Sequence, residues 1–229
     1  MPRVRDVVEF DATKAQIKAI ARAQMAAHGT AGLSLRAIAR EMDVTAPALY
    51  RYYPSLDDLI TALIVDAYNA IADAAEAGDH AVQDRTDYEG RVVSMCLHYR
   101  DWALAHPIDF QLIYGNPIPG YEAPRDLTVP AATRTNIVFT TVLVEAYAAG
   151  KYQSPYTARY PLSPEVRAAA ARIGDAYDVA PELVVAGFTF WEWVQGAIFM
   201  TMFGHASPVE GDPRAVFETN ARILFNLRT

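Results

Sequence analysis

Arginines and several hydroxyl groups cluster between residues 36 and 52 of the chain, and their chemistry suits contacts with a nucleic acid. Arg51 could pair either with the edge of a guanine or with a phosphate. Thr45 and the neighbouring tyrosine hydroxyls could bind phosphate oxygens and thereby fix the register on a duplex. We therefore predict a DNA-binding surface that consists of Arg36, Thr45, Ala46, Pro47, Ala48, Tyr50, Arg51 and Tyr52.

Two short helices joined by a tight turn must position these side chains. Apolar residues at 35, 38, 39 and 42 recur at helical spacing, and those at 46, 49, 50 and 53 repeat the pattern. Asp43 occupies the turn, where aspartate tolerates unusual backbone angles, and Thr45 can cap the second helix. The pattern predicts a helix-turn-helix, although from periodicity alone the tyrosines at 50 and 53 could equally be ordinary core.

Charge is distributed in a way that permits DNA binding at one end of the chain. The formal net charge is −7, but residues 1–55 contain eight Lys and Arg against five Asp and Glu. Residues 56–229 carry a strong net negative charge. Arg3 and Arg5 could enter a minor groove or could belong to an untethered tail.

The chain as a whole carries helical patterns and no sustained alternation typical of strands. We predict an all-α fold of nine to ten helices, with a three-helix DNA-binding domain over residues 1–54 and a second domain over residues 55–229. Expected helices span 12–28, 34–42, 46–53, 55–77, 87–105, 107–115, 131–149, 164–175, 181–205 and 213–227. Residues 116–130 are rich in proline and glycine and are expected to form a loop.

One apolar stretch, residues 183–203, is long enough to cross a bilayer. Glu192 near its middle and the absence of flanking Lys and Arg clusters favour a buried helix of a soluble protein. We expect no membrane partner and a cytoplasmic location, with which the single cysteine, Cys96, is compatible.

Signs of catalysis or metal binding are weak. The five histidines show no metal-ligand spacing with Cys96 or with acids, and no phosphate loop or nucleophile elbow occurs. We expect no metal, no cofactor and no enzymatic activity. Two alternatives stay open: a helical enzyme that uses Glu192 or His98, and a dimeric ligand-binding protein without DNA binding.

The segment from Gly32 to Leu59 resembles the DNA-binding domain of the tetracycline-repressor (TetR) family. The pairs Ile38-Ala39 and Val44-Thr45, the run Leu49-Tyr50-Arg51 and the following aromatic-Pro-Ser stand where that family has them. Two positions depart from the pattern, Asp43 where glycine is usual and Leu56 where a phosphate-binding lysine is usual. Residues 110–124 and 193–196 resemble a Trp-His-Gly type of regulatory domain, with Gln195 in the histidine position.

This resemblance implies a dimer, a pseudo-palindromic double-stranded DNA operator and a small-molecule effector, with repression as the common mode. A ligand-responsive regulator needs a cavity, and cavities are lined mainly by apolar and aromatic groups with a few polar ones. We expect a small, largely apolar effector, neutral or cationic, to bind among Tyr99, Trp102, Phe110, Tyr114, Phe139, Trp191, Glu192 and Gln195. Glu192 could equally be a paired core acid.

The helices at 181–205 and 213–227 are expected to pair with their symmetry mates as a four-helix bundle. Either of two faces could meet the partner. The helix at 181–205 carries apolar residues near one face, namely Phe188, Trp191, Ile198 and Met202. The helix at 213–227 carries another apolar face, formed by Phe217, Ile223, Leu224 and Leu227.

Overall fold

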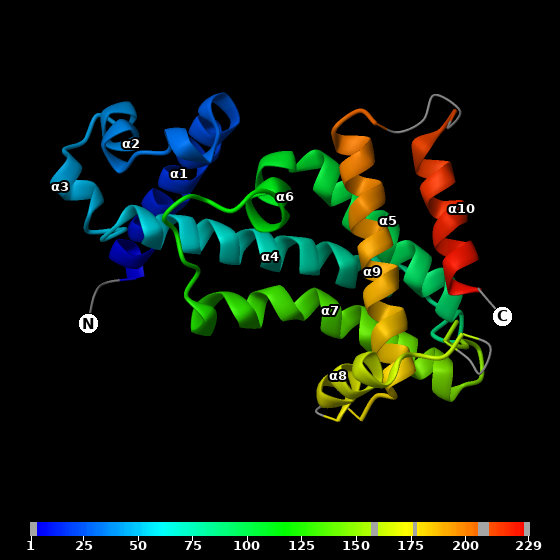
Figure 1. Cartoon of the computed structure of the whole chain (residues 1–229). Helices are drawn as coiled ribbons and strands as arrows, with labels where there is room; N and C mark the ends of the chain where they lie inside the picture. Colours follow the sequence, from blue (N-terminus) through cyan, green and yellow to red (C-terminus); the bar gives the residue numbers. More distant parts are fainter. Residues whose placement is uncertain (1–3, 157–159, 176–177, 206–210, 227–229) are drawn as a thin grey trace. The chain divides into compact units, whose positions relative to one another are not determined.

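A computed structural model describes residues 4–156, 160–175, 178–205 and 211–226. These residues form α-helices and one short 3-10 helix, with no strand among them, which confirms the all-α prediction (Figure 1). The helices are α1 (Val4–His28), α2 (Leu35–Glu41), α3 (Ala46–Leu49), α4 (Leu56–Ala81), α5 (Tyr88–Ala105), α6 (Pro107–Tyr114), α7 (Arg125–Ala148), α8 (Pro164–Gly174), α9 (Pro181–Met202) and α10 (Pro213–Phe225).

Four helix boundaries differ by four or more residues from the sequence-based prediction, and one of them is the end of α4, which lies at Ala81 rather than at residue 77. Helix α1 begins at Val4 rather than at residue 12, and α3 ends at Leu49 rather than at residue 53. Helix α7 begins at Arg125, inside the stretch that was predicted to be a loop, and continues through Pro130. Pro130 is the sixth residue of α7 and lies beyond the four N–H groups that lack helical partners, so it removes one backbone hydrogen bond from the first part of a helix that nevertheless continues.

The chain forms two compact units. The N-terminal unit contains Met1–Asn69 and His106–Ala132, and the C-terminal unit contains Ala70–Ala105 and Thr133–Thr229. Helices α4 and α7 each contribute residues to both units. These compact units are not the two functional domains predicted from the sequence, whose boundary after residue 54 stays a prediction.

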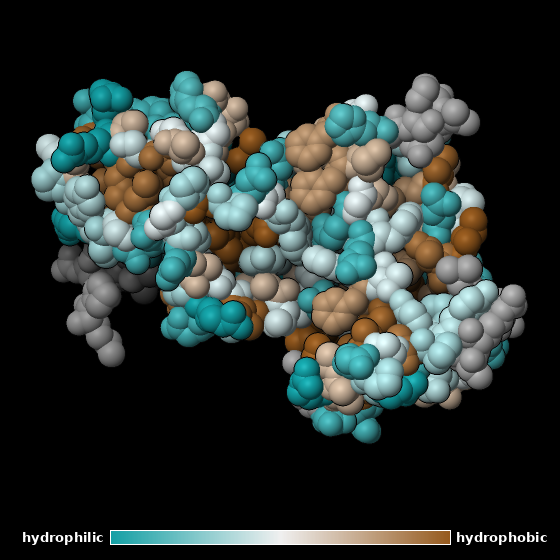
Figure 2. Space-filling model, in the orientation of Figure 1, coloured by the Kyte–Doolittle hydropathy of each residue, from teal (hydrophilic) through white to brown (hydrophobic). Residues whose placement is uncertain are grey.

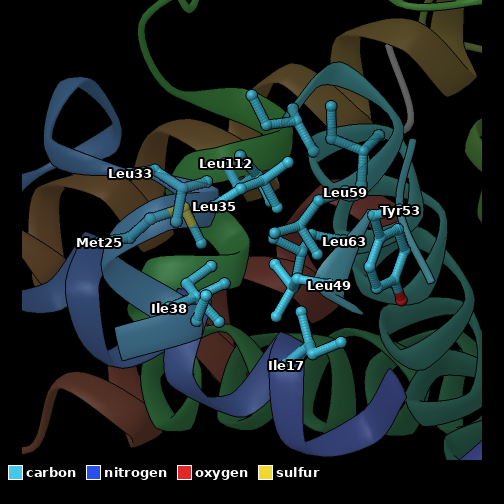
Figure 3. Packing of buried hydrophobic residues seen from close by; sticks show 14 residues of the cluster. Ile17, Met25, Leu33, Leu35, Ile38, Leu49, Tyr53, Leu59, Leu63 and Leu112 are labelled. Carbon is cyan, nitrogen blue, oxygen red and sulfur yellow. The ribbon is translucent and has the colours of Figure 1, made fainter. Parts of the chain in front are cut away.

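The core of the N-terminal unit lies between α1, α2, α3, the first half of α4, and α6 (Figure 3). Ile17, Ile38, Leu49 and Leu63 are at most 1% exposed and meet in its centre. Leu112 of α6 joins the same cluster, so α6 belongs to this core by packing although it is remote from α1–α3 in sequence. Burial of these side chains removes apolar surface from water, the main favourable contribution to folding.

The C-terminal unit packs α5 against α9 and α10, and α8 against α9. A charged cluster lies within it. Asp79 and Arg91 are both buried, and the Nε of Arg91 donates to Oδ1 of Asp79 over 2.7 Å. Nη1 of Arg91 also donates to Glu145 over 2.6 Å, and Arg85 donates to Asp79 over 2.5 Å, so both buried charges are compensated.

Two helices carry unusually much exposed apolar surface. By length and composition alone, α7 and α9 could cross a membrane. In this chain 22% and 28% of their most apolar windows are buried, so the prediction that residues 183–203 form a buried helix is not met within the single chain. In the C-terminal unit, much of this apolar surface lines a cavity or forms an exposed stripe along α9, as described below.

Candidate nucleic-acid interface and ligand cavity

The turn between α2 and α3 explains how two helices are joined so tightly. Asp43 has φ 54°, in the left-handed region that non-glycine residues seldom adopt. The N–H of Val44 donates to the carbonyl of Ala39 and the N–H of Asp43 to that of Arg40, a Schellman arrangement that satisfies the end of α2. Aspartate therefore takes the conformation for which glycine would be the easier choice.

Several side chains predicted to contact DNA are exposed on this helix-turn-helix. Arg36, Thr45, Pro47 and Arg51 are exposed. Thr45 precedes α3 but makes no capping bond, so its hydroxyl is not committed to the helix. Ala46 and Ala48 are half-buried.

The two tyrosines at 50 and 52 differ in exposure. Tyr50 is 42% exposed, which is compatible with its predicted place on the DNA-binding surface and not with its alternative place in the core. Tyr52 is half-buried, and its ring stacks on that of Phe10 from α1, with centroids 4.7 Å apart. Arg3 lies outside the described residues, and the side chain of Arg5 is likewise not described.

Ion pairs tie the helices of the N-terminal unit together. Nε of Arg22 on α1 donates to both carboxylate oxygens of Asp109 on α6, over 2.8 and 3.0 Å. Lys18 pairs with Asp66 of α4. Asp109 is 7% exposed, so this bond is more strongly held than one at the surface.

The C-terminal unit contains a cavity of about 480 Å³, within the range of roughly 300–1,000 Å³ typical of small-molecule sites. Helices α5, α7, α8, α9 and α10 line it. The wall from α9 is apolar, and the wall from α7 carries most of the polar groups. These two walls comprise Leu183, Val184, Gly187, Phe188, Phe190, Trp191 and Val194 from α9, and Thr133, Asn136, Ile137, Phe139, Thr140, Thr141, Leu143, Val144 and Glu145 from α7.

The structure brings together three of the eight residues that were expected to bind the effector. Tyr99, Phe139 and Trp191 line the cavity. Gln195 is buried behind this wall, where its Nε2 donates to the Tyr99 hydroxyl over 2.6 Å and its Oε1 has no hydrogen-bond partner.

The other four do not line the cavity. Phe110 and Tyr114 lie in the N-terminal unit, where their rings pack on each other with centroids 5.2 Å apart. Trp102 is half-buried on α5 outside the cavity lining. Glu192, expected to be partly buried, is exposed, because it projects from the opposite side of α9. The carboxylate in the lining is that of Glu145, a residue not singled out in the sequence.

An exposed apolar stripe runs along α9. Phe188, Met200 and Phe203 are 47%, 50% and 53% exposed, and Glu192 and Gly196 lie between them. Figure 2 shows apolar residues near the two ends of the course of α9, with more hydrophilic residues between them. Ile198 is buried and Trp191 lines the cavity, so two of the four α9 residues that were considered for either face point inward. On α10, Phe217 is buried, Ile223 is exposed and Leu224 is half-buried, while Leu227 lies outside the described residues.

A helix-turn-helix with exposed cations and a separate ligand-sized cavity define the class of a helical DNA-binding regulator. Comparison with known families agrees. Residues 17–63 match the model described as "Bacterial regulatory proteins, tetR family", and residues 92–224 match "Tetracyclin repressor-like, C-terminal domain". The chain belongs to the TetR family of transcriptional regulators. The likeness of residues 110–124 and 193–196 to the Trp-His-Gly type stays a prediction.

Relatives and solved structures extend this assignment along the chain. The HTH-type transcriptional regulators Rv1816 of Mycobacterium tuberculosis and Mb1846 of Mycobacterium bovis are each 36% identical over 92% of this chain and 90% of theirs. The crystal structure of the regulatory protein SCO4313 has a TM-score of 0.75 at 30% identity and covers 99% of this chain and 100% of that one. RolR in complex with resorcinol has the same fold, with a TM-score of 0.53 at 15% identity over 97% of this chain and 91% of that one.

The family settles two predictions made from the sequence. Its members are transcription factors, so the chain is a DNA-binding regulator and not an enzyme. The alternatives of a helical enzyme and of a ligand-binding protein without a DNA-binding domain are therefore set aside.

Proposed function

We propose that this protein is a cytoplasmic repressor that binds a pseudo-palindromic operator as a homodimer and leaves it when a small, largely apolar effector occupies the cavity of the C-terminal unit. The observation that carries the proposal is the cavity of about 480 Å³ in a chain that also presents a helix-turn-helix with exposed cations. Release requires that the effector prefer a dimer conformation in which the two recognition helices no longer match the half-sites. RolR, described as a complex with resorcinol, shows that a protein of this fold holds a small aromatic compound.

DNA binding by the exposed residues is tested with a triple variant, Arg36→Ala, Tyr50→Ala and Arg51→Ala. Tyr52 is left intact because its stacking on Phe10 makes it part of the unit's packing. If Arg51 reads a base, its loss alone costs about 1–3 kcal/mol. Arg172→Ala removes an exposed cation of α8 and serves as the control. Operator affinity that is the same for the triple variant and the control would contradict this surface.

The effector site is tested by filling the cavity. Gly187 lines it, and a Cβ added there meets only Leu143 at 3.9 Å, so a larger side chain does not force the backbone to move. Gly187→Phe is expected to bind the operator but to respond far less to effector. Gly211→Phe, at a position with open space around the Cβ, is the control. Effector-driven release that persists in Gly187→Phe would place the effector elsewhere.

The homodimer is tested at Gly196, which lies in the exposed stripe of α9. A Cβ added at this position meets nothing within 4 Å, so the monomer accommodates a large side chain. If a second α9 packs there, Gly196→Arg shifts the protein toward monomer in sedimentation experiments and weakens operator binding. A variant that stays dimeric at micromolar concentration would move the interface to another surface.

A further inference from the structure

The two long walls of the cavity have opposite chemistry. None of the residues that α9 contributes carries a polar side-chain group other than the indole N–H of Trp191. Helix α7 contributes three threonines, Asn136 and Glu145 to the same cavity. A ligand between these walls therefore meets apolar and aromatic surface on one side and hydroxyl and amide groups on the other.

The charges in the lining are already compensated. Glu145 accepts a hydrogen bond from Arg91 over 2.6 Å, and Arg91 in turn is held by Asp79. Burial raises the pKa of Tyr152, another lining residue, to about 12, so its phenol is neutral at pH 7. Among the described lining residues there is no uncompensated charge to offset the desolvation of a charged ligand.

Two adjacent threonines show which polar groups a ligand can use. The hydroxyl of Thr141 donates to the backbone carbonyl of Ile137 over 2.8 Å, so its proton is engaged within the helix. The Thr140 hydroxyl and the Asn136 amide line the cavity and make no hydrogen bond to the described part of the chain. Both groups can donate to a ligand and accept from it.

We infer that the cavity selects an uncharged, amphipathic effector, which lays an apolar ring face on α9 and directs a hydroxyl, carbonyl or amide group at Thr140 and Asn136 of α7. This inference rests on the proposed effector site and adds the chemical class of its occupant and the residues that set specificity. It excludes the cationic effector that the sequence left open, because the carboxylate in the lining is engaged by Arg91. Trp191 supplies the aromatic surface, and Thr140 and Asn136 supply polarity.

Four probes that share one carbon skeleton test this class: naphthalene, naphthol, naphthoic acid and naphthylmethylamine. Their binding to the purified dimer is followed by the fluorescence of the tryptophans and by thermal shift. We expect naphthol to bind about three- to tenfold more tightly than naphthalene, which is the value of one neutral hydrogen bond. The carboxylate and the amine are expected to bind more weakly than naphthol. Naphthol that binds no better than naphthalene, or a charged probe that matches it, would overturn the inference.

Variants assign the preference to α7. In Thr140→Val the advantage of naphthol over naphthalene is expected to fall severalfold, whereas Thr141→Val keeps it because that hydroxyl is bonded to Ile137. Equal loss in both variants would refute the assignment to Thr140. Gly187→Phe separates this inference from the proposed effector site: if all four probes still bind that variant as they bind the wild type, the cavity is not the site at all.

Discussion

The buried pair of Asp79 and Arg91 allows a stability effect to be predicted from the structure. Asp79 is 8% exposed and Arg91 is 3% exposed. Asp79→Asn keeps the shape of the side chain but removes its charge. Arg91 is then left with Glu145, whose side chain is 46% exposed, as its one carboxylate partner among the described residues. Leaving a buried charge without its partner costs about 3–5 kcal/mol, and we expect the lower end because Asn still accepts a hydrogen bond.

A loss of about 3 kcal/mol corresponds to a fall in Tm of roughly 6–12 °C for a chain of this size. Differential scanning calorimetry at pH 7 measures it. Glu145→Gln is the matched control, because it removes a half-exposed partner of the same arginine and should cost about 1 kcal/mol or less. A Glu145→Gln effect as large as that of Asp79→Asn would refute the argument from burial.

The stability difference between the wild type and Asp79→Asn is also expected to depend on pH. Burial opposes ionisation of Asp79, but hydrogen bonds from Arg91 and Arg85 outweigh it, so its pKa lies below the ordinary value of 3.8. A lowered folded-state pKa stabilises the protein above the unfolded-state value, and this contribution disappears as the pH falls through the folded-state value. The stability gap between wild type and Asp79→Asn is therefore expected to be full at pH 7 and to shrink below pH 4, in urea melts. A gap that is unchanged at acid pH would show that it does not come from this charge.

Three smaller effects are expected in the N-terminal unit. Asp43 has φ 54°, so Asp43→Gly should leave the free energy of unfolding equal or raise it by up to about 1 kcal/mol, whereas Asp43→Val should lower it by about 1–2 kcal/mol. Urea melts measure both changes, and a tolerated valine would contradict the left-handed turn. Ser55→Ala removes the oxygen that accepts the N–H of Asp58 and should cost about 1 kcal/mol, while Thr30→Ala, at an uncapped position, serves for comparison. Phe10→Ala should cost about 1 kcal/mol through the lost stacking on Tyr52 and should also weaken operator binding; unaltered affinity would separate the stack from DNA recognition.

Local patterns in the sequence predicted α2 well, because this helix is short and has one buried face. The apolar spacing at 35, 38 and 39 matches the residues that are buried in α2. At the start of α4, the Ser55 hydroxyl oxygen accepts the N–H of Asp58, and the hydroxyl donates to the Asp58 carboxylate. The end of α3 was misjudged because the apolar spacing continues through Tyr50 and Tyr53. Both tyrosines still donate to the carbonyl four positions earlier, but Tyr52 between them bonds to the carbonyl three positions earlier, and the helix ends at Leu49.

The cavity was harder to predict, because a polar helix face that lines a cavity has the same pattern as one that faces water. Thr140 and Asn136 are themselves exposed, so no pattern in the sequence distinguished them from polar surface residues that line no cavity. Phe110 was expected in the cavity because it lies only a few residues after α5, which lines it. However, α5 belongs to the C-terminal unit and α6, which carries Phe110, belongs to the N-terminal unit. No local pattern shows which of the two cores an aromatic ring joins. Helix α9 is apolar on all sides, so its periodicity could not reveal that Glu192 faces outward.

The chain's single cysteine gives experimenters a practical advantage. Cys96 on α5 is fully buried, and burial raises the pKa of its thiol well above the ordinary value of 9.0, so it stays protonated at neutral pH. Only the thiolate reacts readily with maleimides. A cysteine introduced at an exposed site, such as Arg40 on α2 or Arg172 on α8, can therefore be labelled selectively without first replacing the native residue. Fluorophores or spin labels placed in this way would follow the motion of each unit while operator and effector compete for the intact protein.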